Sequence, residues 1–123
     1  MNLDFASVWE MISDIVPEND ALICGDEIIS WKDYDLQSSK IATALKNAGL
    51  GPNSKAGLYL NNSNEYLIGQ NAIFKIGGVP INVNYRYVAE ELIYLLDNSD
   101  SEAVFYHACY SSRIKEISGS LPN

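Results

Sequence analysis

The sequence is short of the residues that most readily build metal centres and disulfide frameworks. Its 123 residues include one histidine and two cysteines, and the cysteines, Cys24 and Cys109, are far apart and form no CxxC spacing. We therefore expect two reduced, buried thiols, with a disulfide between them as the minor alternative. His107 has no second histidine or suitably spaced cysteine nearby, so a structural role is favoured over a metal site.

Long apolar runs and clusters of basic residues are also missing. No stretch approaches the length that a transmembrane segment needs. Residues 1–16 contain acids but neither lysine nor arginine, which is not the pattern of a secretory signal, so a cytoplasmic location is the default expectation. Binding to nucleic acid requires clustered lysine and arginine, and we therefore expect no nucleic-acid partner.

Acidic residues are abundant, and they are unevenly placed. The formal net charge is −8. Residues 1–35 contain nine acids and only one base, Lys32, whereas the acids and bases from residue 36 onward balance, so the first third carries the whole imbalance. This pattern predicts a solvated acidic face, with an acidic interaction surface as the alternative.

The order of hydrophobic patterns predicts one α/β domain over residues 1–123, with a mostly parallel sheet flanked by helices and a short N-terminal hairpin. Phe5, Val8, Trp9, Ile12 and Val16 are spaced as one buried helical face. The pattern from residue 30 to about 48 is a helix that begins at a Ser30 cap, buries Tyr34, Ile41, Leu45 and Ala48, and ends at Gly49. The expected strands are 21–24, 27–30, 55–60, 79–83 and 103–106, and further helices are expected at about 64–76, after residue 88 and around 110–121.

The stretch from Phe74 to Tyr87 links two of these elements. Gly77 and Gly78 are suited to a helix C-terminus, and Pro80 is tolerated where a short strand begins. A polar and aromatic loop, Asn84 to Tyr87, then follows at the carboxyl end of the strand, where α/β sheets tend to bind ligands. An ordinary helix-to-strand corner is the favoured interpretation of this loop alone, and a candidate pocket rim of Asn84, Tyr85 and Arg86 is the sharper one.

No catalytic set can be assembled from the remaining polar residues. Gly49-Leu-Gly51 follows a helix and leads into a strand, which is the reverse of a phosphate-binding glycine loop. A Cys109–His107 nucleophile pair is a remote alternative. The neighbouring carboxylates Glu90 and Glu91, like Asp97 and Asp100, are explained by helix dipoles and caps. We therefore name no catalytic, cofactor-binding or metal-binding residue.

Three blocks of sequence nevertheless resemble a known family. They are Ile28-Ile-Ser-Trp-Lys-Asp-Tyr34, then Lys55-Ala-Gly-Leu-Tyr-Leu60 with the Asn/Ser-rich residues 61–65, and Ile76-Gly-Gly-Val-Pro-Ile-Asn-Val-Asn-Tyr-Arg-Tyr87 with the helix pattern of residues 91–100. Together they resemble the N-terminal part of the adenylate-forming, AMP-binding superfamily. Asn84 to Tyr87 and Tyr106-His107 are most similar to its acyl-CoA synthetase, or fatty-acid–CoA ligase, branch.

The resemblance implies a reaction in two steps for the parent enzyme. ATP, accompanied by Mg²⁺, activates a carboxylic (fatty) acid as an acyl-adenylate, and coenzyme A then takes the acyl group as a thioester. The family's phosphate loop, its ligand pockets and its swivelling domain with the catalytic lysine have no counterpart in residues 1–123. The resemblance therefore implies an N-terminal fragment whose partner is the remainder of the ligase, and which alone has no cofactor and no ligase activity. A free-standing small α/β binding or interaction module is the alternative.

Overall fold

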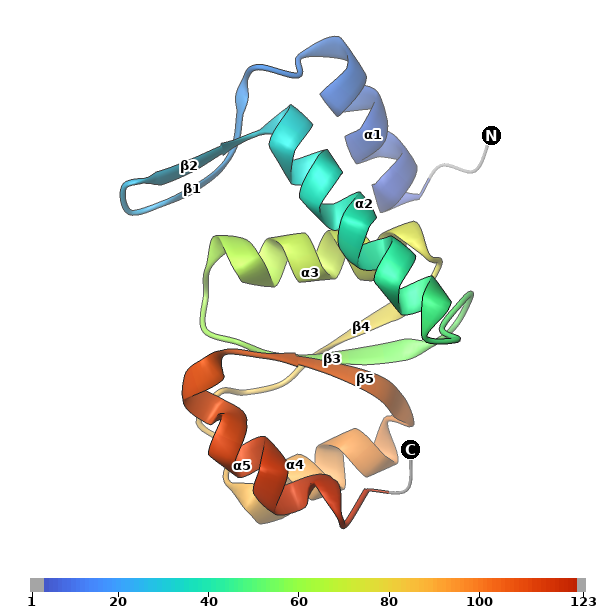
Figure 1. Cartoon of the computed structure of the whole chain (residues 1–123), viewed down its shortest axis with the longest axis vertical. Coiled ribbons are helices and arrows are strands. Elements are labelled where there is room, and N and C mark those ends of the chain that lie inside the picture. The colour runs from blue at the N-terminus through green and yellow to red at the C-terminus, as the bar shows by residue number, and fades with distance from the viewer. Residues whose placement is uncertain (1–3, 122–123) are drawn as a thin grey trace.

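The computed structural model describes residues 4–121 and consists of stacked layers (Figure 1). In its middle lies a parallel sheet of three strands in the order β4-β3-β5, with α3 on one side and α4 and α5 on the other. Two further strands, β1 and β2, form an antiparallel hairpin, while α1 and α2 pack beside and over α3. The expected α/β fold with a parallel sheet and a short N-terminal hairpin is confirmed.

The elements follow the predicted order closely. They are α1 (Phe5–Ile15), β1 (Asp20–Cys24), β2 (Glu27–Ser30), α2 (Trp31–Asn47), β3 (Lys55–Tyr59), α3 (Asn64–Lys75), β4 (Val79–Asn82), α4 (Ala89–Asn98), β5 (Ser101–Tyr106), a short 3-10 turn (Ala108–Tyr110) and α5 (Ser111–Ser118). Within residues 4–121, none of the helices combines the length and the apolar character that crossing a bilayer requires.

The helix α1 exists as expected, and the prediction of its buried face is confirmed only in part: Trp9, Ile12 and Val16 are half-buried, and the Trp9 ring packs near Tyr34 and Phe74. Phe5 and Val8 are exposed, and the helix instead turns Ala6 and Ser13 toward its neighbours. Two polar contacts lie on this inner side: the Ser13 hydroxyl donates to the Trp31 carbonyl at 3.2 Å, and Glu10 pairs with Lys75 on α3. These two contacts could not be predicted from hydrophobic spacing alone.

The helix α2 begins as predicted, because the Ser30 hydroxyl accepts a hydrogen bond from the Asp33 amide. Tyr34 and Leu45 are buried as expected, and burial raises the pKa of the Tyr34 phenol, which donates to the Leu67 carbonyl. The expected burial of Ala48 was wrong. The helix ends at Asn47, and the chain turns away at Gly49, whose φ of +99° is left-handed, so Ala48 is exposed.

The parallel sheet divides the core into two halves by simple alternation along β3. Ala56 and Leu58 face α2 and α3, whereas Tyr59 faces α4 and α5. The predicted corner after α3 is confirmed, since Gly77 has a φ of +76° and Pro80 lies in the edge strand β4. At Gly78 a Cβ atom would lie 2.8 Å from the Ser54 carbonyl oxygen, so only glycine fits this close approach.

The acids of the first third are solvated, as the sequence predicts. Eight of the nine lie on the surface, and only Asp35 is half-buried, where it contacts Lys75. The prediction of buried thiols was wrong, because Cys24 and Cys109 are both free and exposed. Cys24 ends the first strand of the hairpin, and Cys109 lies in the 3-10 turn.

Candidate functional site

The three parallel strands end at the same edge of the sheet, and their following loops meet there. In the register of the sheet, Leu58 pairs with Asn82 on one side, and Tyr59 pairs with Tyr106 on the other. The loops after these strands are residues 60–63, 83–88 and 107 onward. Because ligands of open α/β sheets bind outside the carboxyl ends of the strands, this edge is the candidate site.

The residues predicted as a pocket rim lie together in one turn after β4. The side-chain oxygen of Asn84 accepts a hydrogen bond from the Arg86 amide at 2.9 Å, and the guanidinium of Arg86 lies 5.6 Å from the centre of the Tyr85 ring. All three residues are exposed. A cavity of about 370 Å³ begins at the next residue, Tyr87, and continues along α4. The turn thus presents a cation over an aromatic ring at the sheet edge.

Tyr87 ties this turn to the core. Its carbonyl oxygen accepts hydrogen bonds from the hydroxyl of Tyr59, at 3.2 Å, and from Nη1 of Arg113, at 2.9 Å. Tyr59 is fully buried in β3, and Arg113 comes from α5, so two elements far apart in sequence hold one carbonyl. Neither donor could be predicted from the sequence, because no local pattern links residues 59 and 113 to residue 87.

Tyr110 connects the loop after β3 to the same edge. Tyr110 stacks on Tyr59 with ring centres 4.6 Å apart, and its hydroxyl donates to the Asn61 side chain after β3. Desolvation first, and then the neighbouring Cys109, Tyr59 and Tyr85, raise the pKa of Tyr110, so the phenol stays a donor. Together these contacts fix the positions of the loops.

His107, for which the sequence favours a structural role, lies half-buried at the end of β5. It lines a cavity of about 240 Å³ between α2, α3 and β5, and its ring centre is 6.4 Å from that of Tyr110. Over residues 4–121, no group of three or more histidine, cysteine, aspartate or glutamate side chains is arranged to hold a metal ion. The side chains described at this edge are mainly aromatic rings and hydrogen-bond donors.

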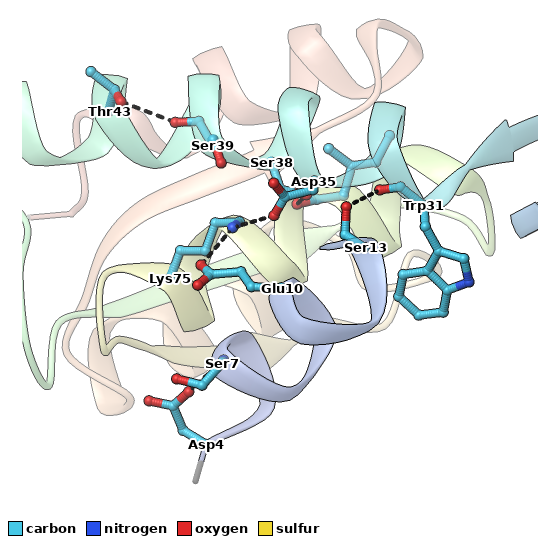
Figure 2. A network of polar contacts seen from close by, with 11 residues as sticks. Asp4, Ser7, Glu10, Ser13, Trp31, Asp35, Ser38, Ser39, Thr43 and Lys75 are labelled. Carbon is cyan, nitrogen blue, oxygen red and sulfur yellow. Dashed lines mark hydrogen bonds and ion pairs between the residues drawn. The ribbon is translucent and has the colours of Figure 1, made fainter. Parts of the chain in front are cut away.

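A second polar centre lies away from this edge, between α1, α2 and α3 (Figure 2). The side chain of Lys75 is 8 % exposed, and its ammonium contacts Glu10 at 2.8 Å and Asp35 at 2.7 Å. Desolvation by itself lowers the pKa of Lys75, but the hydrogen bonds and charges of Asp35 and Glu10 outweigh it, and the net pKa is raised. With its charge matched on two sides, Lys75 fastens α1 to the fold.

Comparison with known proteins places the chain in a family. A family model described as AMP-binding enzyme matches residues 13–122. A medium/long-chain-fatty-acid–CoA/3-oxocholest-4-en-26-oate–CoA ligase of Mycobacterium marinum is 39% identical over 121 residues, which cover 98% of this chain and 22% of that protein. The chain thus spans about a fifth of the length of the curated relatives that it matches.

Solved structures agree in fold. A benzoate CoA ligase from Burkholderia xenovorans is similar with a TM-score of 0.90 and 17% identity, over 97% of this chain and 24% of that chain. The N-terminal domain of FACL13 from Mycobacterium tuberculosis is similar with a TM-score of 0.88 and 21% identity, over 99% of this chain and 33% of that chain. At these identities, the likeness shows the fold alone.

Proposed function

This chain belongs to the AMP-binding enzyme family, and from that premise we propose that it forms the N-terminal part of an ATP-dependent acyl-CoA synthetase. Residues 1–123 would then be one α/β unit of a larger ligase domain, and the remainder of that ligase would be its partner. The observation that carries the proposal is the alignment of 98% of the chain with 22% of a fatty-acid–CoA ligase.

The proposed parent reaction joins a fatty acid to coenzyme A in two steps. The carboxylate first attacks ATP and forms an acyl-adenylate with release of pyrophosphate, and the thiol of coenzyme A then displaces AMP. Mg²⁺ supplies positive charge that offsets the phosphate charges during the first step. We propose that the groups that hold this ion lie in another part of the parent ligase, as the resemblance implies.

The proposed role of this chain in the reaction is to position the substrate and not to supply reacting groups. The loop of Asn84, Tyr85 and Arg86 is the proposed rim of a ligand pocket, supported by its place at the carboxyl edge of the sheet and by the two donors on the Tyr87 carbonyl. A rim residue can orient a substrate only if its backbone is fixed, and this carbonyl is the point of fixation.

The isolated chain is proposed to be inactive as a ligase, and acid-dependent ATP–pyrophosphate exchange tests this directly. We expect no exchange above a no-protein control with any fatty acid. Turnover above that control, at a rate proportional to chain concentration, would refute the proposal of inactivity.

A chimera tests the proposed place in the parent enzyme. Residues 13–122 replace the aligned segment of the M. marinum ligase, and we expect the folded chimera to retain fatty-acid adenylation. A chimera that folds but does not adenylate would contradict the assignment. Reading the nucleotide sequence past codon 123 separates this proposal from a free-standing module, since only a ligase frame continues into a Ser/Thr/Gly-rich phosphate loop.

A further inference from the structure

The helix α1 has two apolar faces, although it packs through only one. Its inner side is fixed by Ala6, by Ser13 and by the Glu10–Lys75 pair. On the opposite side, Val8, Met11 and Ile15 are 40%, 46% and 74% exposed. Their spacing of i, i+3 and i+7 places them in one stripe along the helix, and Phe5, 63% exposed, extends the stripe at its start. We call these four residues the outer α1 face.

A groove opens beside the N-terminal half of this face. It has a volume of about 500 Å³ and runs between α1 and the corner that follows α3. The ring of Phe5 lies 5.3 Å from that of Phe74, which forms an aromatic floor. Its lining consists of Asp4, Phe5, Val8, Phe74, Gly77 and Gly78. A groove of this kind suits an apolar side chain of a partner.

The charges around the outer α1 face are acidic. Asp4 precedes Val8 by four residues and Asp14 follows Met11 by three, so each carboxylate is a neighbour of the stripe. Both are exposed, whereas Glu10 on the inner side is matched by Lys75. Lys32 is the sole base among residues 1–35. An anionic membrane or a second copy of this chain would be repelled by these charges, and a cation would be attracted.

We propose that the outer α1 face docks a cationic amphipathic helix of a partner protein. The apolar face of such a helix would cover Val8, Met11 and Ile15 and place one apolar side chain in the groove. Its lysine or arginine side chains would lie beside Asp4 and Asp14. Apolar anchors at helical spacing supply the affinity in contacts of this type, and the complementary charges supply the orientation and the rate of encounter.

The probe for the test is a helical peptide of leucine and lysine of about 18 residues, long enough to form a helix. Two control peptides accompany it: one with glutamate in place of lysine, and one of the same composition with its leucines scattered around the helix. Fluorescence anisotropy of the labelled peptides measures their affinity for the 123-residue chain. We expect the amphipathic cationic peptide to bind at least about tenfold more tightly than either control.

Variants locate the binding. The triple change Val8→Ser, Met11→Ser, Ile15→Ser should weaken binding at least about tenfold, because it removes the apolar anchors. The pair Asp4→Asn, Asp14→Asn keeps the α1 cap and the apolar stripe, so it should leave the fold intact and weaken binding with a reduced salt dependence. Ile23→Ser removes a 67% exposed apolar side chain on the hairpin strand β1 and should change nothing.

Three results would overturn the proposal. The first is equal binding of the cationic peptide to the wild-type chain and to the Asp4→Asn, Asp14→Asn variant, a comparison that remains decisive if the triple variant fails to fold. The second is binding to phosphatidylglycerol vesicles that the triple variant abolishes, which would assign the face to a membrane. The third is a dimer in sedimentation velocity that the same variant dissociates, which would assign it to a second copy.

Discussion

The two sides of the parallel sheet are built for different tasks. On the side of α2 and α3, the core consists of packed aliphatic residues that include Leu58 and Ile73. On the side of α4 and α5, the core includes Tyr59, whose hydroxyl reaches out to hold the carbonyl of Tyr87. One side therefore contributes apolar burial, while the other connects the core to the loops of the candidate site.

The N-terminal caps of the helices also differ between the two sides of the sheet. On the first side, α2 and α3 begin at Ser30 and Ser63, whose hydroxyls accept hydrogen bonds from backbone amides. On the second side, where the structure describes both helix starts, α4 begins at Val88 and α5 at Tyr110 without a side-chain cap. We therefore expect the side of α4 and α5 to be the less stable one, as is common for functional regions.

The largest effect is expected from Leu58→Ala on the α2–α3 side. Leu58 is fully buried in the central strand, and its truncation leaves a cavity that should cost about 2–5 kcal/mol in the free energy of unfolding. Urea denaturation measures this cost. Leu67→Ala on the exposed side of α3 is the control, and a similar loss there would contradict the view that this side stabilises by burial.

The ion network of Lys75 gives the next effect, which depends on pH. We expect Lys75→Met to cost about 1–2 kcal/mol at neutral pH, because the partner carboxylates are partly hydrated and survive the loss of the cation. The pKa of Lys75 is raised above its ordinary value of 10.5, so the pair contributes in full below that pH and is lost as the pH rises through the higher, folded-state value.

The measurement is the difference in unfolding free energy between the wild-type chain and Lys75→Met at a series of alkaline pH values. Taking the difference cancels the titration of the tyrosines that both chains share. A gap that closes already between pH 7 and pH 10 would contradict the raised pKa of this lysine.

Much of the fold could be predicted because its signals are local. The spacing of Tyr34 and Leu45 lies within one helix, and the cap at Ser30 and the left-handed glycines Gly49 and Gly77 each act on the residues next to them. Strand and helix therefore alternate in the sequence as they do in the structure, and the parallel sheet follows from that alternation.

The features that the sequence could not predict depend on contacts between distant residues. Glu10 and Lys75 are far apart in the chain, yet they pair in the structure, and Phe5 and Val8 are exposed although their spacing predicts burial. At the site, the loop of Asn84 to Arg86 could be named from its place after a strand. Its support by Tyr59 and Arg113 could not, because neither spacing nor composition relates these residues to Tyr87.

A third effect tests the loop side directly. Tyr59→Phe keeps the buried ring but removes one of the two donors to the Tyr87 carbonyl, and we expect a loss of about 1 kcal/mol. Amide exchange of residues 84–87 should accelerate more than that of β3. The double variant Tyr59→Phe, Arg113→Met should lose more unfolding free energy than the two single variants together, because the Tyr87 carbonyl then has neither donor.

Tyr66→Phe is the matched control on the other side of the sheet. Its hydroxyl donates to the Asn82 side chain in an exposed contact of 2.9 Å, so its loss should leave exchange in residues 84–87 unchanged. Equal acceleration in both variants would mean that the Tyr87 carbonyl is not the point that fixes the loop.

The smallest effect is a gain in stability on the weaker side. Val88 has the extended backbone of an N-cap, with φ of −96° and ψ of 178°, but its side chain cannot accept a hydrogen bond. Val88→Ser supplies the missing acceptor at a position that is already 49% exposed, so little apolar burial is lost, and we expect a stabilisation of about 0.5–1 kcal/mol by urea denaturation. Val88→Ala separates the cap from the loss of a β-branched residue, and Ser63→Ala should remove a comparable amount at the start of α3. If the serine is no more stabilising than the alanine, the uncapped start of α4 is not what weakens this side of the sheet.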